Sequence, residues 1–134
     1  TRKLIADAAE IFREEILEYR TRLDRSSSDE ERDAYGRVLA QAYNQYAWLI
    51  GNTTGDQQEA LLFSQRSLEL RPGEAGHLDT LGRCYYAVGD LENAIKNQRE
   101  AVRLEPHTGQ LRRQLEFFLK EQEQRKPSKE TPSP

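Results

Sequence analysis

Apolar residues in the first part of the chain recur with the spacing of an α-helix. From residue 2 to residue 24 they are separated alternately by four and three positions, which keeps them on one face of a helix. Charged residues fill the other faces, and Glu18 stands four positions before Arg22, the spacing of a stabilising ion pair. The pattern predicts an amphipathic helix whose apolar stripe consists of Ile5, Ala9, Phe12, Ile16, Tyr19 and Leu23.

A second long helix is predicted after the serine run that interrupts this pattern. Ser28 and Glu31 have the S-x-x-E spacing of a capping box, in which the hydroxyl accepts a hydrogen bond from a free amide and the carboxylate reaches back to the cap. The helix should begin near Asp29 and run to about Ile50, where Gly51 and the polar residues after it are expected to end it.

Four shorter helices are predicted in the rest of the chain, over residues 57–70, 75–88, 91–105 and 108–124. Asp56 and Asp90 are expected to cap two of them, and a glycine or proline follows each of the first three. Residues 125–134 contain three prolines and no apolar anchor, so we expect a disordered tail.

An internal repeat with a period of 34 residues is the most specific signal in the sequence. Such a period, divided into two helices and a turn, is typical of stacked helical repeats. The aligned pairs include glycine, aspartate and proline, which occur at helix ends, and alanine, which fits a close crossing of two helices. Without a gap, Gly55-Asp56 aligns with Gly89-Asp90, Ala60 with Ala94, Leu70 with Leu104 and Pro72 with Pro106.

The second copy resembles the tetratricopeptide repeat (TPR), whose pattern is W-x2-L-G-x2-Y, then A-x3-F, then P. Gln98 departs from that pattern, which usually has an aromatic residue there. The first copy fits less well, because Ala47-Trp48 replaces Leu-Gly and Ser64 replaces the Phe. The matching positions of the second copy are Leu78 at the Trp position, Leu81, Gly82, Tyr85, Ala94, Ala101 and Pro106.

The resemblance implies an all-α, right-handed superhelical stack of antiparallel helix pairs with about six helices. Residues 41–74 form a diverged unit and residues 75–108 a second unit. Long N-terminal helices over residues 1–40 pack on the repeats, and residues 109–124 form a capping helix before the tail at 125–134. Gly82 and Ala94 are expected at a close crossing of two helices, and Gly55 and Gly89 in the left-handed conformation that ends a helix.

The resemblance also implies a concave groove lined by the first helix of each unit, where a protein or peptide binds. On the helix from Gln41 we expect a core of Asn44, Ala47, Trp48 and Gly51, with Ala42, Gln45, Leu49 and Asn52 facing the groove. The equivalent groove positions are Gly76, Asp79, Arg83 and Tyr86, followed by Gln110, Arg113, Phe117 and Lys120. The predicted partner-binding residues are Asn52, Asp79, Arg83, Tyr86, Arg113, Phe117 and Lys120.

Purely structural roles are also possible for some of these residues. Phe117 can equally pack the last helix, and Arg83 can simply pair with Asp79 four positions earlier. Related adaptors that bind chaperone tails use a Lys/Asn/Arg clamp for a terminal carboxylate. The positions of its Lys and Asn hold Gln45 and Leu49 in one unit, so a chaperone-tail adaptor is not expected.

Composition narrows the function classes. The chain of 134 residues is 36% hydrophobic and 32% charged, with a net charge of −3, so neither membrane insertion nor nucleic-acid binding is predicted. The single cysteine, Cys84, is expected to be a small core or interface residue and weakly favours a reducing compartment. The absence of methionine suggests a processed or excised product, from which any signal peptide has been removed.

The sequence offers no catalytic, cofactor or metal site. His77 and His107 have no ligand spacing with Cys84 and are expected to be exposed or to cap helices. We therefore predict a non-catalytic adaptor or scaffold for protein–protein interaction. Two alternatives remain open: a homodimer formed through the apolar stripe of the first helix, and an accessory domain of a larger enzyme or secreted protein.

Overall fold

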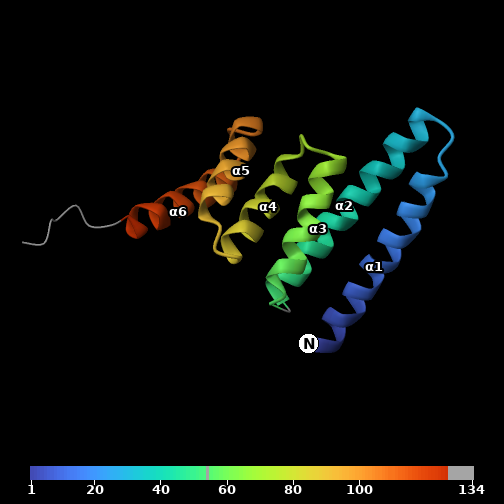
Figure 1. Cartoon of the computed structure of the whole chain (residues 1–134), viewed down its shortest axis with the longest axis horizontal. Helices are drawn as coiled ribbons and strands as arrows, with labels where there is room; N and C mark the ends of the chain where they lie inside the picture. Colours follow the sequence, from blue (N-terminus) through green and yellow to red (C-terminus); the bar gives the residue numbers. More distant parts are fainter. Residues whose placement is uncertain (54, 127–134) are drawn as a thin grey trace, which may run out of the picture.

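Six helices follow one another along the part of the chain that the structure describes, residues 1–53 and 55–126, in a computed structural model (Figure 1). Each helix packs against the next one in the chain, and α2 also contacts α4. The all-α architecture predicted from the sequence is therefore confirmed. The helices are α1 (Arg2–Asp24), α2 (Asp29–Thr53), α3 (Gln57–Leu70), α4 (Ala75–Ala87), α5 (Leu91–Leu104) and α6 (Gly109–Arg125).

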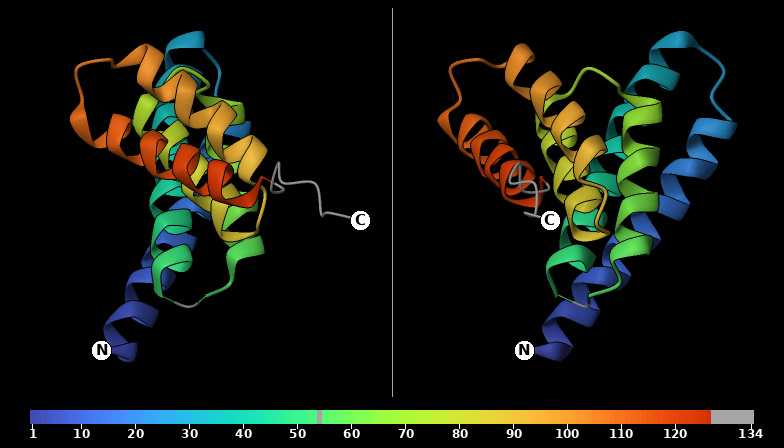
Figure 2. Two further views of the ribbon diagram at one scale, coloured as in Figure 1. Left: turned by 90° about the vertical axis from the view of Figure 1, so that its left-hand side faces the viewer. Right: turned by 60° about the vertical axis from the view of Figure 1, so that its left-hand side comes forward.

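The apolar stripe of α1 packs inside the molecule. Ala9 and Ile16 are buried in one cluster with Leu39 and Tyr43 of α2, and Phe12, Tyr19 and Leu23 of the stripe lie against the same cluster. Burial of this stripe against α2 holds the long α1–α2 hairpin together. The N-terminal end of α1 extends beyond the other helices in both views of Figure 2.

Helix α2 begins at the predicted capping box. The Glu31 amide donates to the Ser28 hydroxyl at 3.1 Å, as the S-x-x-E spacing predicts. The Glu31 carboxylate reaches back one residue further than expected, because it accepts from the Ser27 amide at 3.1 Å instead of the Ser28 amide. Two free amides at the start of the helix are satisfied in this way.

The predicted end of α2 is wrong, because the helix continues through Gly51 to Thr53. A Cβ atom at Gly51 would lie 3.4 Å from the Cβ of Ala60 on α3, at the tight end of ordinary contacts. Gly51 therefore permits close approach of α2 and α3 and does not end the helix. The turn is formed later, where Gly55 has a φ of 77° and Asp56 accepts from the Glu59 amide at 3.1 Å.

Helices α4 and α5 cross at Gly82 and Ala94, as the repeat pattern predicts. A Cβ atom at Gly82 would lie 2.7 Å from Oε1 of Gln98 and 3.4 Å from the Ala94 carbonyl oxygen, and Ala94 is completely buried. Gly89 ends the first helix of this pair with a φ of 89°, and Asp90 accepts from the Asn93 amide at 3.1 Å.

Helix α6 lies at the other end of the stack and packs against α5 (Figure 1). It continues to Arg125, one residue beyond its predicted end. The expected disordered tail otherwise falls almost wholly on residues 127–134, which lie outside the described residues. None of the helices described is long and apolar enough to cross a membrane.

Candidate functional site

A hollow of about 360 Å³ lies where α2, α4 and α6 face one another. These helices contribute aromatic, small and polar side chains. The hollow is called the groove below. It is lined by Ala47, Trp48, Gly51 and Asn52 of α2, Gln57 of α3, Thr80, Arg83, Cys84, Tyr86 and Ala87 of α4, and Gln114 and Phe117 of α6.

Two exposed aromatic side chains come from different helices of the groove. Trp48 of α2 is 54% exposed and Phe117 of α6 is 43% exposed, although large apolar side chains are usually buried. The residues of α4 between them include the small Cys84 and Ala87, which leave space above the helix. The groove thus combines apolar walls with room for an inserted side chain, an arrangement typical of binding sites.

The Phe117 side chain is positioned by an aromatic cluster. Its ring meets the Tyr86 ring edge-on, with the centroids 5.3 Å apart. Tyr86 in turn stacks on the fully buried Phe118, with centroids 5.2 Å apart. These contacts hold α6 against α4 and hold Phe117 at the edge of the groove. Because Tyr86 takes part in the packing of α6, it contributes to the fold as well as to the groove surface.

Arg83 is the charged residue of the groove lining, and two polar neighbours fix its position. Its Nε donates to Oδ2 of Asp79 at 3.1 Å. The other Asp79 oxygen accepts from Nε2 of the buried Gln98 at 2.8 Å, and the same amide nitrogen donates to the Leu111 carbonyl at 3.1 Å. Gln98, the departure from the repeat pattern, therefore links α4, α5 and α6 beneath the guanidinium.

The predicted partner-binding residues fall into two groups. Asn52, Arg83, Tyr86 and Phe117 all line the groove. Asp79 lies beneath it, with its side chain only 14% exposed and both carboxylate oxygens occupied. Arg113 and Lys120 are exposed on α6 but are not among the residues that line the hollow.

The predicted orientation of α2 is wrong by about one residue position around the helix. Trp48, expected in the core, lines the groove, whereas Ala42, expected in the groove, is buried. Leu49 packs partly against the core cluster between α1 and α2. The reason is that α2 packs against α1 as well as against α3 and α4, so more of its surface is buried.

A signal for Trp48 was present in the repeat alignment. At an offset of 34 residues Trp48 stands at the position of Gly82, where even a Cβ atom would collide with the neighbouring helix. A tryptophan cannot fit at such a crossing and has to point away from it. The mismatch therefore favoured an exposed Trp48.

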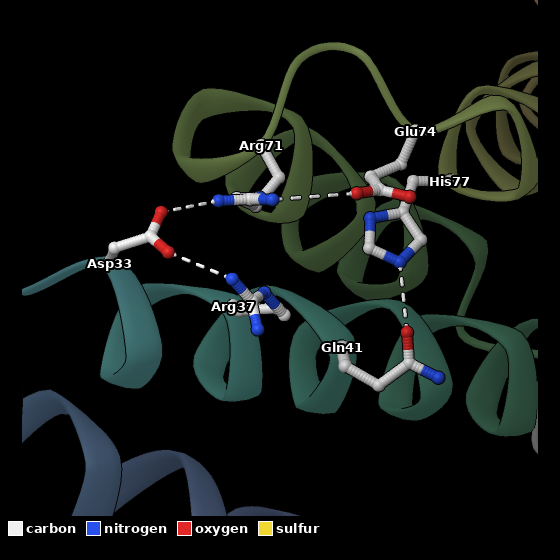
Figure 3. Close-up of polar contacts among 6 residues, drawn as sticks. All are labelled: Asp33, Arg37, Gln41, Arg71, Glu74 and His77. Atoms are coloured by element: carbon white, nitrogen blue, oxygen red, sulfur yellow. Dashed lines mark hydrogen bonds and ion pairs between the residues drawn. The ribbon is translucent and has the colours of Figure 1, made fainter. Parts of the chain in front are cut away.

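Ion pairs and a hydrogen bond connect α2 to the turn after α3 and to the start of α4 (Figure 3). Arg71, just after α3, pairs with Asp33 of α2 at 2.8 Å and with Glu74 at 3.8 Å. His77 of α4 places Nε2 3.0 Å from Oε1 of Gln41 of α2, a hydrogen bond in which the ring N–H donates. These contacts tie together the two helices that form one side and the floor of the groove.

His77 is a further correction to the sequence analysis, since it is buried and neither exposed nor a cap. Its Nδ1 is buried without a hydrogen-bond partner among the described residues. Burial lowers the pKa of His77 below its usual value of 6.5, the Glu74 carboxylate opposes that shift, and Arg71 adds to it. The imidazole is therefore kept in its neutral form. His107, by contrast, is exposed as expected.

Stability should depend on pH through His77. Because its pKa is lowered by folding, the unfolded chain takes up the proton first when the pH falls below about 6.5. The free energy of unfolding should be fully retained above that pH and decrease as the pH falls towards the folded-state pKa. Urea unfolding at pH 7.5 and 5.5 measures the decrease, and His77→Gln should make it smaller. An equal decrease in both proteins would contradict this role.

Cys84 occupies the floor of the groove as a buried thiol, as the sequence analysis expected. Burial raises the pKa of the Cys84 thiol to about 11. The thiolate is the nucleophilic and metal-binding form of cysteine, so this thiol is unreactive at neutral pH. No group of three His, Cys, Asp or Glu side chains that could hold a metal ion occurs in the described chain.

Comparisons with known proteins point to one family. Residues 78–108 match the family model described as tetratricopeptide repeat. A solved structure with a similar fold is the C-terminal TPR-containing domain of a putative FK506-binding protein from Plasmodium falciparum. It has a TM-score of 0.68 and 19% sequence identity, and the match covers 90% of this chain and 87% of that one. No curated protein matches the sequence significantly.

Proposed function

We propose, from the tetratricopeptide-repeat match of residues 78–108 and the similar fold of a TPR-containing domain, that the chain is a protein-interaction module that binds a protein or peptide partner in the groove between α2, α4 and α6. The observation that carries this proposal is the exposure of Trp48 and Phe117 on opposite sides of the groove. Exposing two large aromatic side chains costs the free chain hydrophobic stabilisation, which a partner restores by covering them.

The function proposed is non-catalytic, and the chemistry of the groove supports this. Among its lining residues Arg83 is bound to Asp79, and the Cys84 thiol remains protonated at neutral pH. Neither group offers an activated nucleophile or a general base. We propose an adaptor or scaffold in which the partner contributes any chemistry.

The division of the chain proposed from the repeat alignment has support in the helix pairs. α2 packs on α3 and α4 packs on α5, in keeping with units at residues 41–74 and 75–108. α1 and the first part of α2 lie on one side of this pair of units, and α6 on the other. In this scheme residues 1–40 and 109–124 cover the apolar faces that single units would leave exposed.

The two alternative functions are a homodimer formed through α1 and an accessory domain of a larger protein. A homodimer would need an apolar surface outside the α1–α2 packing, and Leu4 and Ile11 are exposed there at 67% and 62%. The mass of the protein in solution distinguishes this alternative from a monomeric adaptor. The accessory-domain alternative leaves the groove as the binding surface and differs only in what the chain is attached to.

The groove proposal is tested by Trp48→Ala and Phe117→Ala in affinity capture of partners, followed by titration of the partner recovered. Each variant should bind about thirtyfold more weakly, because losing an aromatic anchor at an interface centre commonly costs about 2 kcal/mol. Leu62→Ala on α3 is the matched control, since Leu62 is also exposed but does not line the groove. Capture that is undiminished in both aromatic variants would refute binding in the groove.

A further inference from the structure

We propose that the groove receives a partner segment with a bulky apolar side chain next to a side-chain carboxylate, and that Arg83 binds the carboxylate. This inference rests on the proposed function and specifies the chemistry of the partner. The apolar requirement follows from the walls and floor of the groove. Trp48 and Phe117 flank it, while Ala47, Cys84 and Ala87 leave space that a branched or aromatic side chain can fill.

The carboxylate requirement follows from the way Arg83 is held. Its Nε is bound to Asp79 at 3.1 Å, whereas its two terminal nitrogens make no hydrogen bond to any described residue. Nε2 of Gln98 donates to the other Asp79 oxygen at 2.8 Å and so holds the carboxylate in place. The Nε side of the Arg83 guanidinium is therefore fixed. Arg83 lines the hollow together with Trp48 and Phe117, so its two terminal nitrogens are left as donors at the groove, and a pair of N–H donors matches a carboxylate.

Charges on the surrounding helix faces favour an acidic partner over a basic one. No carboxylate is among the described residues that line the groove, and Asp79 and Glu121 on the groove helices are each paired, with Arg83 and Arg125. Arg113 and Lys120 lie four positions before and three after Phe117, on the same face of α6. Neither forms an ion pair within residues 1–53 and 55–126, so their charges remain available to attract an acidic segment.

Trp48 is the only tryptophan of the chain, so its fluorescence reports directly on the groove. The probes are three sets of capped peptides of equal length, in which Leu or Phe is followed by Glu, by Gln or by Lys. Covering the exposed indole should shift its emission to shorter wavelength. We expect the Glu set to bind about tenfold more tightly than the Gln set, and the Lys set to bind most weakly.

Arg83→Gln tests the assigned contact, and Arg99→Gln is the matched control, because Arg99 is exposed on α5 outside the groove. Arg83→Gln should remove the preference for Glu over Gln peptides and leave the Trp48 response to apolar peptides in place. Arg99→Gln should leave the preference unchanged. The circular dichroism spectra of both variants are compared with that of the parent.

The outcomes separate this inference from the groove proposal. A preference for Lys peptides, equal binding of all three sets, or an unchanged preference in Arg83→Gln would overturn the carboxylate assignment while binding in the groove still stands. The parent protein alone decides the first two outcomes, so the test does not depend on the folding of the variant. If capture of the natural partner survives Trp48→Ala and Phe117→Ala, the groove proposal itself is lost.

Discussion

Replacing Phe118 with alanine is expected to destabilise the protein by about 3–5 kcal/mol, the usual cost of removing a buried phenylalanine. Phe118 is completely buried, stacks on Tyr86 and reaches towards Gly82 of α4. Leu111 is the other buried residue of α6, so Phe118 provides much of the packing that holds this helix on the stack. Urea unfolding followed by circular dichroism measures the change.

The neighbouring Phe117→Ala variant is the control for this prediction. Phe117 has the same side chain on the same helix but is 43% exposed, and its main ring contact is the edge-on one with Tyr86. Its loss should cost about 1 kcal/mol or less in stability. Similar losses in the two variants would mean that α6 is not anchored through Phe118.

Ala94→Leu is expected to cost about 1–3 kcal/mol, because a larger side chain overpacks the crossing of α4 and α5. Ala94 is completely buried, and its carbonyl oxygen lies only 3.4 Å from where a Cβ of Gly82 would be. Ala34→Leu introduces the same group at an exposed position of α2 and should change stability by no more than about 0.5 kcal/mol. Thermal unfolding of the two variants makes the comparison. Equal melting temperatures would place Ala94 outside a close crossing.

Some features of the fold could be predicted from the sequence because they depend on short-range interactions. The capping residues Ser28, Asp56 and Asp90 bond to amides three positions away, and Gly89 ends a helix through its own backbone conformation. The 34-residue period was equally visible, because each unit repeats the same contacts with its neighbour. Gly82, the small residue of a close crossing, followed from that repeat.

The groove lining was only partly predictable, because it depends on how many neighbours each helix has. α2 packs against α1, α3 and α4 together, and this buries Ala42 and leaves Trp48 facing the groove. The burial of His77 likewise depends on a contact between segments far apart in the chain, because Gln41 of α2 meets the imidazole at the start of α4. The sequence by itself determined the helices, their caps and the repeat, which are set by local geometry. Only the tertiary structure decided which face of each helix remains exposed, because that depends on packing between segments far apart in the chain.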